Sequence, residues 1–273
     1  MKNVAIIMAG GRSTRYCRRT NTTTPKQFTL FKNGKTLIEE TILRISNCIQ
    51  NEDIYVVVNK KDVNYVSKYI TNIPKENIIF EPLSKNTAPC IGYAAMVIKK
   101  KYNDANIIVL PSDHVINDVA SFDKDIRLAI NNINDNNILL LGVTPKRVET
   151  GYGYVQIPSD SQLPITKIIN FDEKPSYNKA KQYIASNNYL WNTGIYITRN
   201  STIINNISIY LNDLYQILER IYISIDNNQE EIVKKEYKNI VSSSIDFGIM
   251  EKTSNLSIIK ASFDWKDIGT IEE

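Results

Sequence analysis

The chain has 273 residues, a formal charge of +4 at pH 7, 42% hydrophobic residues and 23% charged residues. This length can bury a sizeable core, and the composition is that of a folded globular protein. The basic residues are interleaved with acidic ones and form no stripe beside aromatic side chains, which argues against a nucleic-acid partner. No signal-peptide pattern opens the chain and no apolar stretch approaches membrane length, so the sequence predicts a cytoplasmic protein with no membrane partner.

The side chains that build zinc sites and hydrolytic triads are scarce. Cys17, Cys48 and Cys90 are odd in number and lack a C-x-x-C spacing, which argues against a disulfide framework and a structural zinc site. The single histidine, His114, excludes a histidine-rich metal site and disfavours a Ser-His-Asp hydrolase. Its position next to Asp113 is more typical of a structural or capping histidine than of a catalytic base.

In the first half of the chain, predicted strands alternate with predicted helices. Apolar runs rich in β-branched residues predict strands at 4–7, 54–58, 78–80, 107–110 and 138–143. Helical spacing of apolar residues predicts helices at 36–49, 61–70, 88–102 and 122–133, the first of which opens with a capping-box pattern from Thr36 to Glu39. The alternation predicts an α/β fold with a Rossmann-like, mostly parallel sheet flanked by helices, which binds ligands at the carboxyl ends of its strands.

The pattern changes after residue 142. Longer strands are predicted at 152–158, 165–171 and 190–198, and we expect them to form a β-rich lid over the sheet. Helices at 204–223 and 230–240 and a short strand at 256–260 follow. Because no linker or internal repeat interrupts the chain, we expect a single domain over 1–273, made of two halves at roughly 1–145 and 146–273.

The loop after the first predicted strand has the composition of an anion-binding loop. Gly10 and Gly11 let the backbone approach a ligand closely, and Arg15 and Lys26 are among the basic residues that follow. A mobile basic surface loop is the alternative interpretation of these residues taken alone.

Two carboxylates are candidate metal ligands. Asp113 follows the predicted strand 107–110 and is therefore presented at the carboxyl edge of the sheet, where Mg²⁺ binds one or two carboxylates together with substrate phosphates. A helix N-cap is an equally good interpretation of Asp113. Asp267 could complete the pair, although Asp264 is as eligible on chemistry alone.

Three segments of the second half carry further candidates. Glu173 and Lys174 end a predicted strand, where neighbours share one site only if the strand is ending or bulged; a surface turn is the alternative. Gly153 belongs to a G-Y-G-Y stretch that gives close backbone approach, which a hairpin explains as well. Asn192 lies in an apolar strand, and a buried amide needs partners, of which a ligand hydroxyl is one.

Taken together, these segments resemble the mannose-1-phosphate guanylyltransferases, or GDP-mannose pyrophosphorylases, of the sugar nucleotidyltransferase superfamily. The resemblance runs over nearly the whole chain, with the motifs in the family's order. They are G-G-x-G-[ST]-R at 10–15, P-K-Q-F at 25–28, E-P-x-x-R-N-T-A-P at 81–89, P-S-D-H at 111–114, G-Y-G-Y at 151–154, F-x-E-K-P at 171–175, W-N-[ST]-G at 191–194, S-I-D-[YF]-x-x-M-E-K at 244–252 and D-[VI]-G-[ST] at 267–270.

The resemblance implies that mannose 1-phosphate attacks the α-phosphorus of GTP, giving GDP-mannose and pyrophosphate. The nucleophile is already a phosphate anion, so no general base is required, and the site must hold two polyanions in line. The resemblance further implies Mg²⁺ as the cofactor and leaves a homodimer open.

The resemblance also implies a role for individual residues. For the triphosphate it implies binding by the backbone of Gly10, Gly11 and Ser13 and charge stabilisation by Arg15 and Lys26. For Mg²⁺ it implies Asp113 and Asp267. For the base it implies Asn86, Thr87 and Pro89, and for the sugar it implies Gly153, Glu173 and Asn192, with Lys174 on the sugar phosphate.

The chain departs from the family pattern at Ser13, where relatives have a fourth glycine, at 16–21, and at Lys85, where relatives have arginine. We also expect the C-terminal β-helix extension of relatives to be absent. These departures leave two alternatives: a catalytically weak nucleotide-sugar-binding paralogue or regulatory subunit, and a nucleotidyltransferase for another sugar 1-phosphate or nucleotide. Retention of the basic residues and of Asp113 and Asp267 favours the active enzyme.

Overall fold

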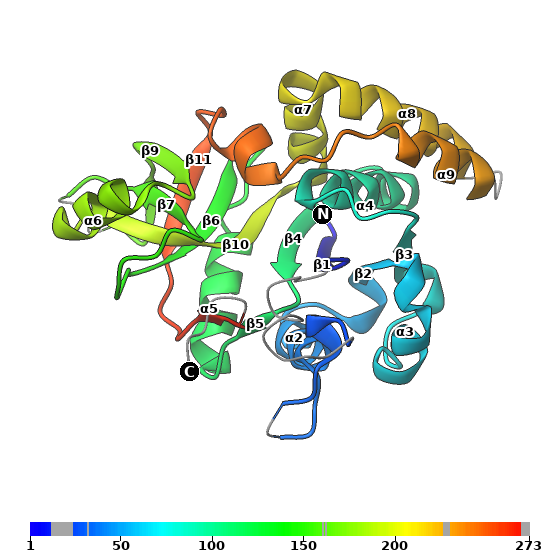
Figure 1. The fold of residues 1–273 in the computed structure, drawn as a ribbon, viewed down its shortest axis with the longest axis horizontal. Helices are drawn as coiled ribbons and strands as arrows, with labels where there is room; N and C mark the ends of the chain where they lie inside the picture. The colour runs from blue at the N-terminus through cyan, green and yellow to red at the C-terminus, as the bar shows by residue number, and fades with distance from the viewer. Residues whose placement is uncertain (12–23, 32, 160, 162, 226–229, 269–273) are drawn as a thin grey trace.

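The computed structural model describes residues 1–11, 24–31, 33–159, 161, 163–225 and 230–268, and a large mixed sheet forms its centre (Figure 1). The strand order is β3-β2-β1-β4-β10-β6-β11-β8. The bounds are β1 (Asn3–Ala9), β2 (Ile54–Asn59), β3 (Ile78–Glu81), β4 (Asn106–Pro111), β6 (Ile138–Val143), β8 (Ile165–Lys167), β10 (Tyr189–Arg199) and β11 (Leu256–Lys260). Strands β3, β2, β1 and β4 are parallel, as are β6 and β11, and β10 runs antiparallel between β4 and β6. The predicted Rossmann-like, mostly parallel sheet is confirmed.

Helices cover both faces of this sheet (Figure 1). One face packs against α4 (Thr87–Tyr102), α7 (Asn200–Tyr210), α8 (Asn212–Ile225) and α9 (Glu230–Lys238), and the other against α2 (Leu37–Ser46), α3 (Val63–Tyr69) and α5 (Val119–Ile130). Along β1, Val4 and Ile6 face the first layer, while Ala5 and Ile7 face the second. Burial on both faces explains why this strand is a continuous apolar run rather than an alternating one.

The predicted capping box at the start of α2 is confirmed. The Thr36 hydroxyl accepts a hydrogen bond from the Glu39 amide, and the Glu39 carboxylate accepts one from the Thr36 amide at 2.7 Å. The box satisfies two backbone groups that a helix start leaves unpaired. The predicted helix at 204–223 is instead two helices, because Leu211 has φ −135° and ψ 52°, outside helical values, and separates α7 from α8.

The predicted lid needs two corrections. The predicted strand 190–198 is most of β10, which lies in the centre of the sheet rather than over it and is buried through Ile195, Tyr196 and Ile197. The predicted strand 165–171 is two strands: β8 pairs with β11, and β9 (Asn170–Glu173) pairs with β7 (Gly153–Gln156). A local apolar pattern does not specify which distant strand will be its partner.

A smaller β-rich unit does project from one end of the sheet (Figure 1). It consists of β7, β9, the first residues of β10 and α6 (Tyr177–Ala185), and its own core contains Tyr152, Tyr154, Trp191 and Ala180. In the described part of the chain, no helix combines the length and the apolar character that crossing a membrane requires.

The parallel strands β2 and β3 end in register. Asn59 at the end of β2 lies opposite Glu81 at the end of β3. Glu81 is only 2% exposed and accepts a hydrogen bond from the Tyr237 hydroxyl of α9. Burial raises the pKa of Glu81 to about 7, against the opposing effect of hydrogen bonds from Tyr237 and Cys90.

The raised pKa of Glu81 predicts a pH-dependent stability. A carboxyl whose pKa is about 7 when folded and near 4.5 when unfolded favours folding most below pH 4.5, and this contribution is lost as the pH rises through 7. The shift corresponds to roughly 3 kcal/mol, or several degrees in Tm. We therefore expect Glu81→Gln to reduce the fall in Tm between pH 5.5 and pH 8, measured by thermal unfolding.

The matched control is Glu52→Gln, which makes the same substitution at an exposed glutamate. Part of the pH dependence should remain in Glu81→Gln, because burial also raises the pKa of Glu173 to about 7. A Glu81→Gln variant that keeps the full wild-type difference in Tm between the two pH values would contradict the assignment.

Candidate active site

The candidate site begins where β1 and β4 end side by side. Gly10 and Gly11 follow β1, Asp113 follows β4, and the Ser112 amide donates a hydrogen bond to the Met8 carbonyl, which keeps the two strand exits together. From β1 the chain adds β2 and β3 on one side, and then returns to add β4 on the other side of β1. This reversal of strand order is where open α/β sheets bind ligands.

A buried lysine joins two carboxylates at this edge. Lys26, which is 3% exposed, lies in the short helix η1 (Lys26–Phe28), and its Nζ donates to Asp113 Oδ2 and to Asp267 Oδ1, each at 2.8 Å. Burial alone would lower the pKa of Lys26, but the charges of the two aspartates outweigh that effect and raise it, so the side chain stays cationic.

The turn that carries Lys26 is anchored to the core by the two residues that follow the lysine. The Gln27 amide donates a hydrogen bond of 2.6 Å to the Ala9 carbonyl at the end of β1. The Phe28 ring is buried and stacks on Tyr65 of α3, with ring centroids 5.0 Å apart. The ammonium group of Lys26 is thereby positioned relative to β1 by its neighbours in sequence.

A two-stranded ribbon brings Asp267 to Asp113. Strand β5 (His114–Val115) pairs antiparallel with β12 (Lys266–Asp267), and Asp267 lies opposite His114. His114 is buried, its ring packs edge-on against Trp265 at 5.2 Å, and burial lowers its pKa. These surroundings fit the predicted structural role of this histidine.

The structure separates the alternatives that the sequence left open for the acidic residues. Helix α5 begins at Val119 and is capped by Asp118, so Asp113 does not cap it. Asp264 accepts hydrogen bonds from the Asn117 and Asp118 amides at 2.9 Å and holds that loop. Asp267, rather than Asp264, is the carboxylate that faces the same cation as Asp113.

The Asp113 and Asp267 pair fits a magnesium ion. Their side chains are 34% and 25% exposed, and both direct carboxylate oxygens at one point that already holds a cationic group, the Lys26 ammonium. Within the described ranges, no group of three or more His, Cys, Asp and Glu side chains could hold a metal. Mg²⁺ needs no such group, because it takes one or two carboxylates and completes its octahedron with water and phosphate oxygens.

A second polar cluster lies in the β-rich unit. Gly153 of β7 lies opposite Glu173 of β9, and a Cβ at Gly153 would be 2.6 Å from Glu173 Oε2, so a larger residue there would displace the Glu173 carboxylate. Lys174 has φ 52°, a left-handed conformation that ends the strand, and its Nζ pairs with Glu173 Oε1. The two neighbours therefore share one site, and burial of Glu173 contradicts the surface-turn interpretation.

Asn192 extends this cluster to a residue that the sequence analysis did not select. Its amide donates to the Tyr196 hydroxyl and to Asp246 Oδ1, each at 3.1 Å, and Tyr196 donates to the same Asp246 oxygen. The buried Asn192 thus finds its partners within the protein. Asp246 lies in the motif at 244–252, and that motif was the signal that could have identified it.

Burial raises the pKa of both carboxyls in this cluster. The pKa of Glu173 is raised to about 7, to which the nearby Asp246 contributes, while Lys174 acts in the opposite direction. Burial likewise raises the pKa of Asp246. The carboxyl, amide and ammonium groups together offer both donors and acceptors, which suits a polyhydroxylated ligand.

The residues expected at the base surround the start of α4. Asn86 has φ 75° and caps the helix by accepting from the Thr87 amide at 2.8 Å. The Thr87 hydroxyl accepts from the Ile245 amide at 2.8 Å, which ties this helix start to the segment that carries Asp246. Pro89 is buried in the first turn, where the missing N–H leaves no hydrogen bond unmade.

The two clusters are neighbours through an aromatic contact. Trp265 packs against His114, which follows Asp113, and against Tyr152, which precedes Gly153, with ring centroids 5.2 and 5.0 Å apart. The structure thus links the cluster around Asp113 to the cluster around Glu173 through one aromatic side chain. The predicted site residues Ser13 and Arg15 lie outside the described residues.

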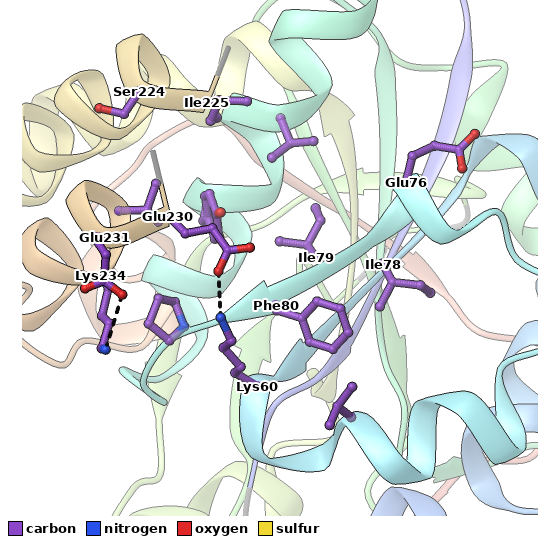
Figure 2. Close-up of a pocket in the computed structure, with 15 residues that line it drawn as sticks. Lys60, Glu76, Ile78, Ile79, Phe80, Ser224, Ile225, Glu230, Glu231 and Lys234 are labelled. Atoms are coloured by element: carbon purple, nitrogen blue, oxygen red, sulfur yellow. Dashed lines mark hydrogen bonds and ion pairs between the residues drawn. The ribbon is translucent and has the colours of Figure 1, made fainter. Parts of the chain in front are cut away.

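A separate pocket of about 520 Å³ lies at the β3 edge of the sheet (Figure 2). Its apolar floor includes Ile78, Ile79 and Phe80, and at this pocket Lys60 Nζ forms an ion pair of 2.7 Å with Glu230 of α9. Among the predicted site residues that the structure describes, none lines it. The candidate site is therefore defined by the two polar clusters and not by this cavity.

Comparison with known proteins gives consistent results. The Nucleotidyl transferase family model matches residues 4–273. Mannose-1-phosphate guanylyltransferase RfbM of Salmonella typhimurium is 31% identical over 276 residues, which cover 99% of this chain and 57% of that protein. Alginate biosynthesis protein AlgA of Pseudomonas aeruginosa is 29% identical over 276 residues, which cover 98% of this chain and 56% of AlgA. The chain spans little more than half the length of these relatives.

Solved structures agree on the fold. The crystal structure of mannose-1-phosphate geranyltransferase from Thermus thermophilus superposes with a TM-score of 0.87 at 28% identity, covering 98% of this chain and 77% of that one. Mannose-6-phosphate isomerase from Helicobacter pylori superposes with a TM-score of 0.80 at 23% identity, covering 98% and 100%, which shows the shared fold alone. On the family match over nearly its whole length, this chain belongs to the Nucleotidyl transferase family.

Proposed function

We propose that the protein transfers GMP from GTP to mannose 1-phosphate, forming GDP-mannose and pyrophosphate. The observation that carries the proposal is the bridge from Lys26 to Asp113 and Asp267 beside the glycine turn after β1. It occurs in a chain similar to proteins named mannose-1-phosphate guanylyltransferase. Because the chain covers only part of those relatives, the substrates are part of the proposal.

The reaction needs charge compensation rather than proton transfer. The attacking group is a phosphate oxygen, and the transferring and leaving groups are phosphates, so the barrier is dominated by repulsion and by alignment. The backbone of Gly10 and Gly11 would hold the triphosphate, and Lys26, together with Arg15, would stabilise its charge. No histidine is needed, which agrees with the buried position of His114.

Asp113 and Asp267 would hold Mg²⁺. The ion would supply Lewis-acid stabilisation at the α-phosphate when bound. Lys26 donates to one oxygen of each carboxylate, so the lysine and the metal would share the two aspartates.

The β-rich unit would bind the sugar. Gly153, Glu173 and Asn192 would face the hydroxyl groups, with Lys174 on the phosphate of mannose 1-phosphate, and Asp246 joins them through its hydrogen bond with Asn192. The start of α4, with Asn86, Thr87 and Pro89, would lie at the guanine. This arrangement assigns nucleotide binding to the half at 1–145 and sugar binding to the half at 146–273.

The substrate assignment predicts the outcome of a panel assay. Pyrophosphate release is measured with Mg²⁺ across nucleoside triphosphates and sugar 1-phosphates, and we expect the highest kcat/KM for GTP with mannose 1-phosphate. Faster turnover of another pair would reassign the substrates. No turnover with any pair, together with saturable GDP-mannose binding, would indicate a binding paralogue.

The metal assignment predicts a difference between two aspartates of the same C-terminal segment. Asp267→Asn and Asp113→Asn should each lower kcat by at least about a hundredfold, because each removes a charged metal ligand. Asp264→Asn is the matched control and should keep most of the activity while lowering Tm, since Asp264 holds the 117–118 loop. Equal losses of kcat at Asp264 and Asp267 would refute the assignment.

Because Lys26 contacts both aspartates, we expect its substitution to have opposite effects on Mn²⁺ affinity and on kcat. Lys26→Met should lower kcat, because a cation is lost from the phosphate site, and should tighten Mn²⁺ binding, because the two carboxylates no longer contact an ammonium group. Mn²⁺ affinity is measured by electron paramagnetic resonance without substrate. Weaker Mn²⁺ binding by a folded Lys26→Met protein would contradict the shared arrangement.

A further inference from the structure

The glycine turn after β1 is held by side chains that carry none of the proposed catalytic or binding roles. The Ser84 hydroxyl, in the segment between β3 and α4, donates a hydrogen bond of 2.9 Å to the Gly10 carbonyl. We propose that Ser84 is a positioning residue for the nucleotide, acting through the peptide between Gly10 and Gly11. The inference rests on the proposed role of this turn in binding the triphosphate.

The direction of the Ser84 hydrogen bond is fixed by a second residue. The Asn59 amide at the end of β2 donates to Ser84 Oγ at 2.9 Å, while Asn59 Oδ1 accepts from the Lys61 amide at 3.0 Å. Asn59 is 7% exposed, so the amide end of this arrangement is buried, whereas Ser84 itself is exposed. Because a hydroxyl has one proton and Ser84 accepts from Asn59, the proton is directed to the Gly10 carbonyl.

Holding the Gly10 carbonyl orients the next amide. In a planar trans peptide the C=O and the following N–H point in opposite directions. When the Gly10 oxygen points to Ser84, the Gly11 N–H therefore points away from it. Gly11 is exposed, and an exposed backbone N–H can donate to an anion.

A second residue, at the end of β3, restricts the Cα of Gly10. A Cβ built on Gly10 would clash with Glu81 Oε2, and Glu81 is held in turn by the Tyr237 hydroxyl. Gly10 is thus confined between a carboxyl beside its Cα and a hydroxyl on its carbonyl. The peptide is oriented before the ligand arrives, which lowers the ordering cost of binding.

Ser84 lies at a position that the family motif leaves unspecified, the second x of E-P-x-x-R-N-T-A-P. Neither the motif nor the candidate substrate contacts single it out. The assignment comes from the hydrogen bonds that join β2, this segment and the end of β1.

The test compares Ser84→Ala with Ser84→Thr and Ser208→Ala. Loss of the hydroxyl should raise KM for GTP about three- to tenfold, the effect of one hydrogen bond, with KM for mannose 1-phosphate unchanged. Ser84→Thr keeps the hydroxyl and should stay near wild type. Ser208→Ala removes a serine bond to a carbonyl in α7 and should change neither KM. An unchanged KM for GTP in Ser84→Ala would overturn the proposal.

Hydrogen exchange gives a readout that does not depend on turnover. Without nucleotide, the peptide that ends at residue 11 should exchange faster in Ser84→Ala than in the wild type or in Ser208→Ala. If the wild type releases no pyrophosphate from GTP and mannose 1-phosphate, the proposed function fails. The role of Ser84 is then tested by two comparisons of Ser84→Ala with the wild type: the exchange rate of this peptide and the affinity for the nucleotide that the panel assay selects. Equal rates and equal affinities in the two proteins would refute the role.

Discussion

The candidate site depends on one buried cation between two anions. Lys26 would be costly to bury alone, and Asp113 and Asp267 would repel one another without a cation between them. Each charge therefore stabilises the positions of the other two. The three residues come from three separate segments of the chain. Gln27 and Phe28 anchor the lysine to β1 and α3. The lysine in turn contacts both carboxylates, so their position depends on the central strand β1.

Strand β10 connects this charged centre to the cluster around Glu173 and Asn192. Its second half lies between β4 and β6 in the core, and its first half pairs with β7 of the β-rich unit. The register shifts between Asn192 and Tyr196, where Gly194 has φ 71°. At this irregularity the strand changes its pairing partners. Asn192 and Tyr196, on either side of it, both donate hydrogen bonds to Asp246.

The glycine turn shows how a loop is fixed without large apolar contacts. The Gly10 carbonyl is held from β2 through Ser84, and its Cα faces Glu81, whose own partner comes from α9. Two strand ends and a helix distant in the chain thus converge on one peptide. Each of these interactions is a directional hydrogen bond or a close contact.

Local patterns in the chain were enough to predict the elements that depend on neighbouring residues and the chemistry of single positions. Strands β1, β2, β4, β6 and β11 are apolar runs buried on both faces, the capping box specifies the start of α2, and the motifs at 10–15 and 111–114 identified Gly10 and Asp113. The family resemblance pointed to Asp267, and the pairing of β12 with β5 shows how it reaches Asp113. Two features emerged only from the folded chain: β10 lies inside the sheet, and Asp246 completes the Asn192 cluster. The physical reason is that strand pairing and buried hydrogen bonds join residues far apart in the chain, and local periodicity carries no information about the partner.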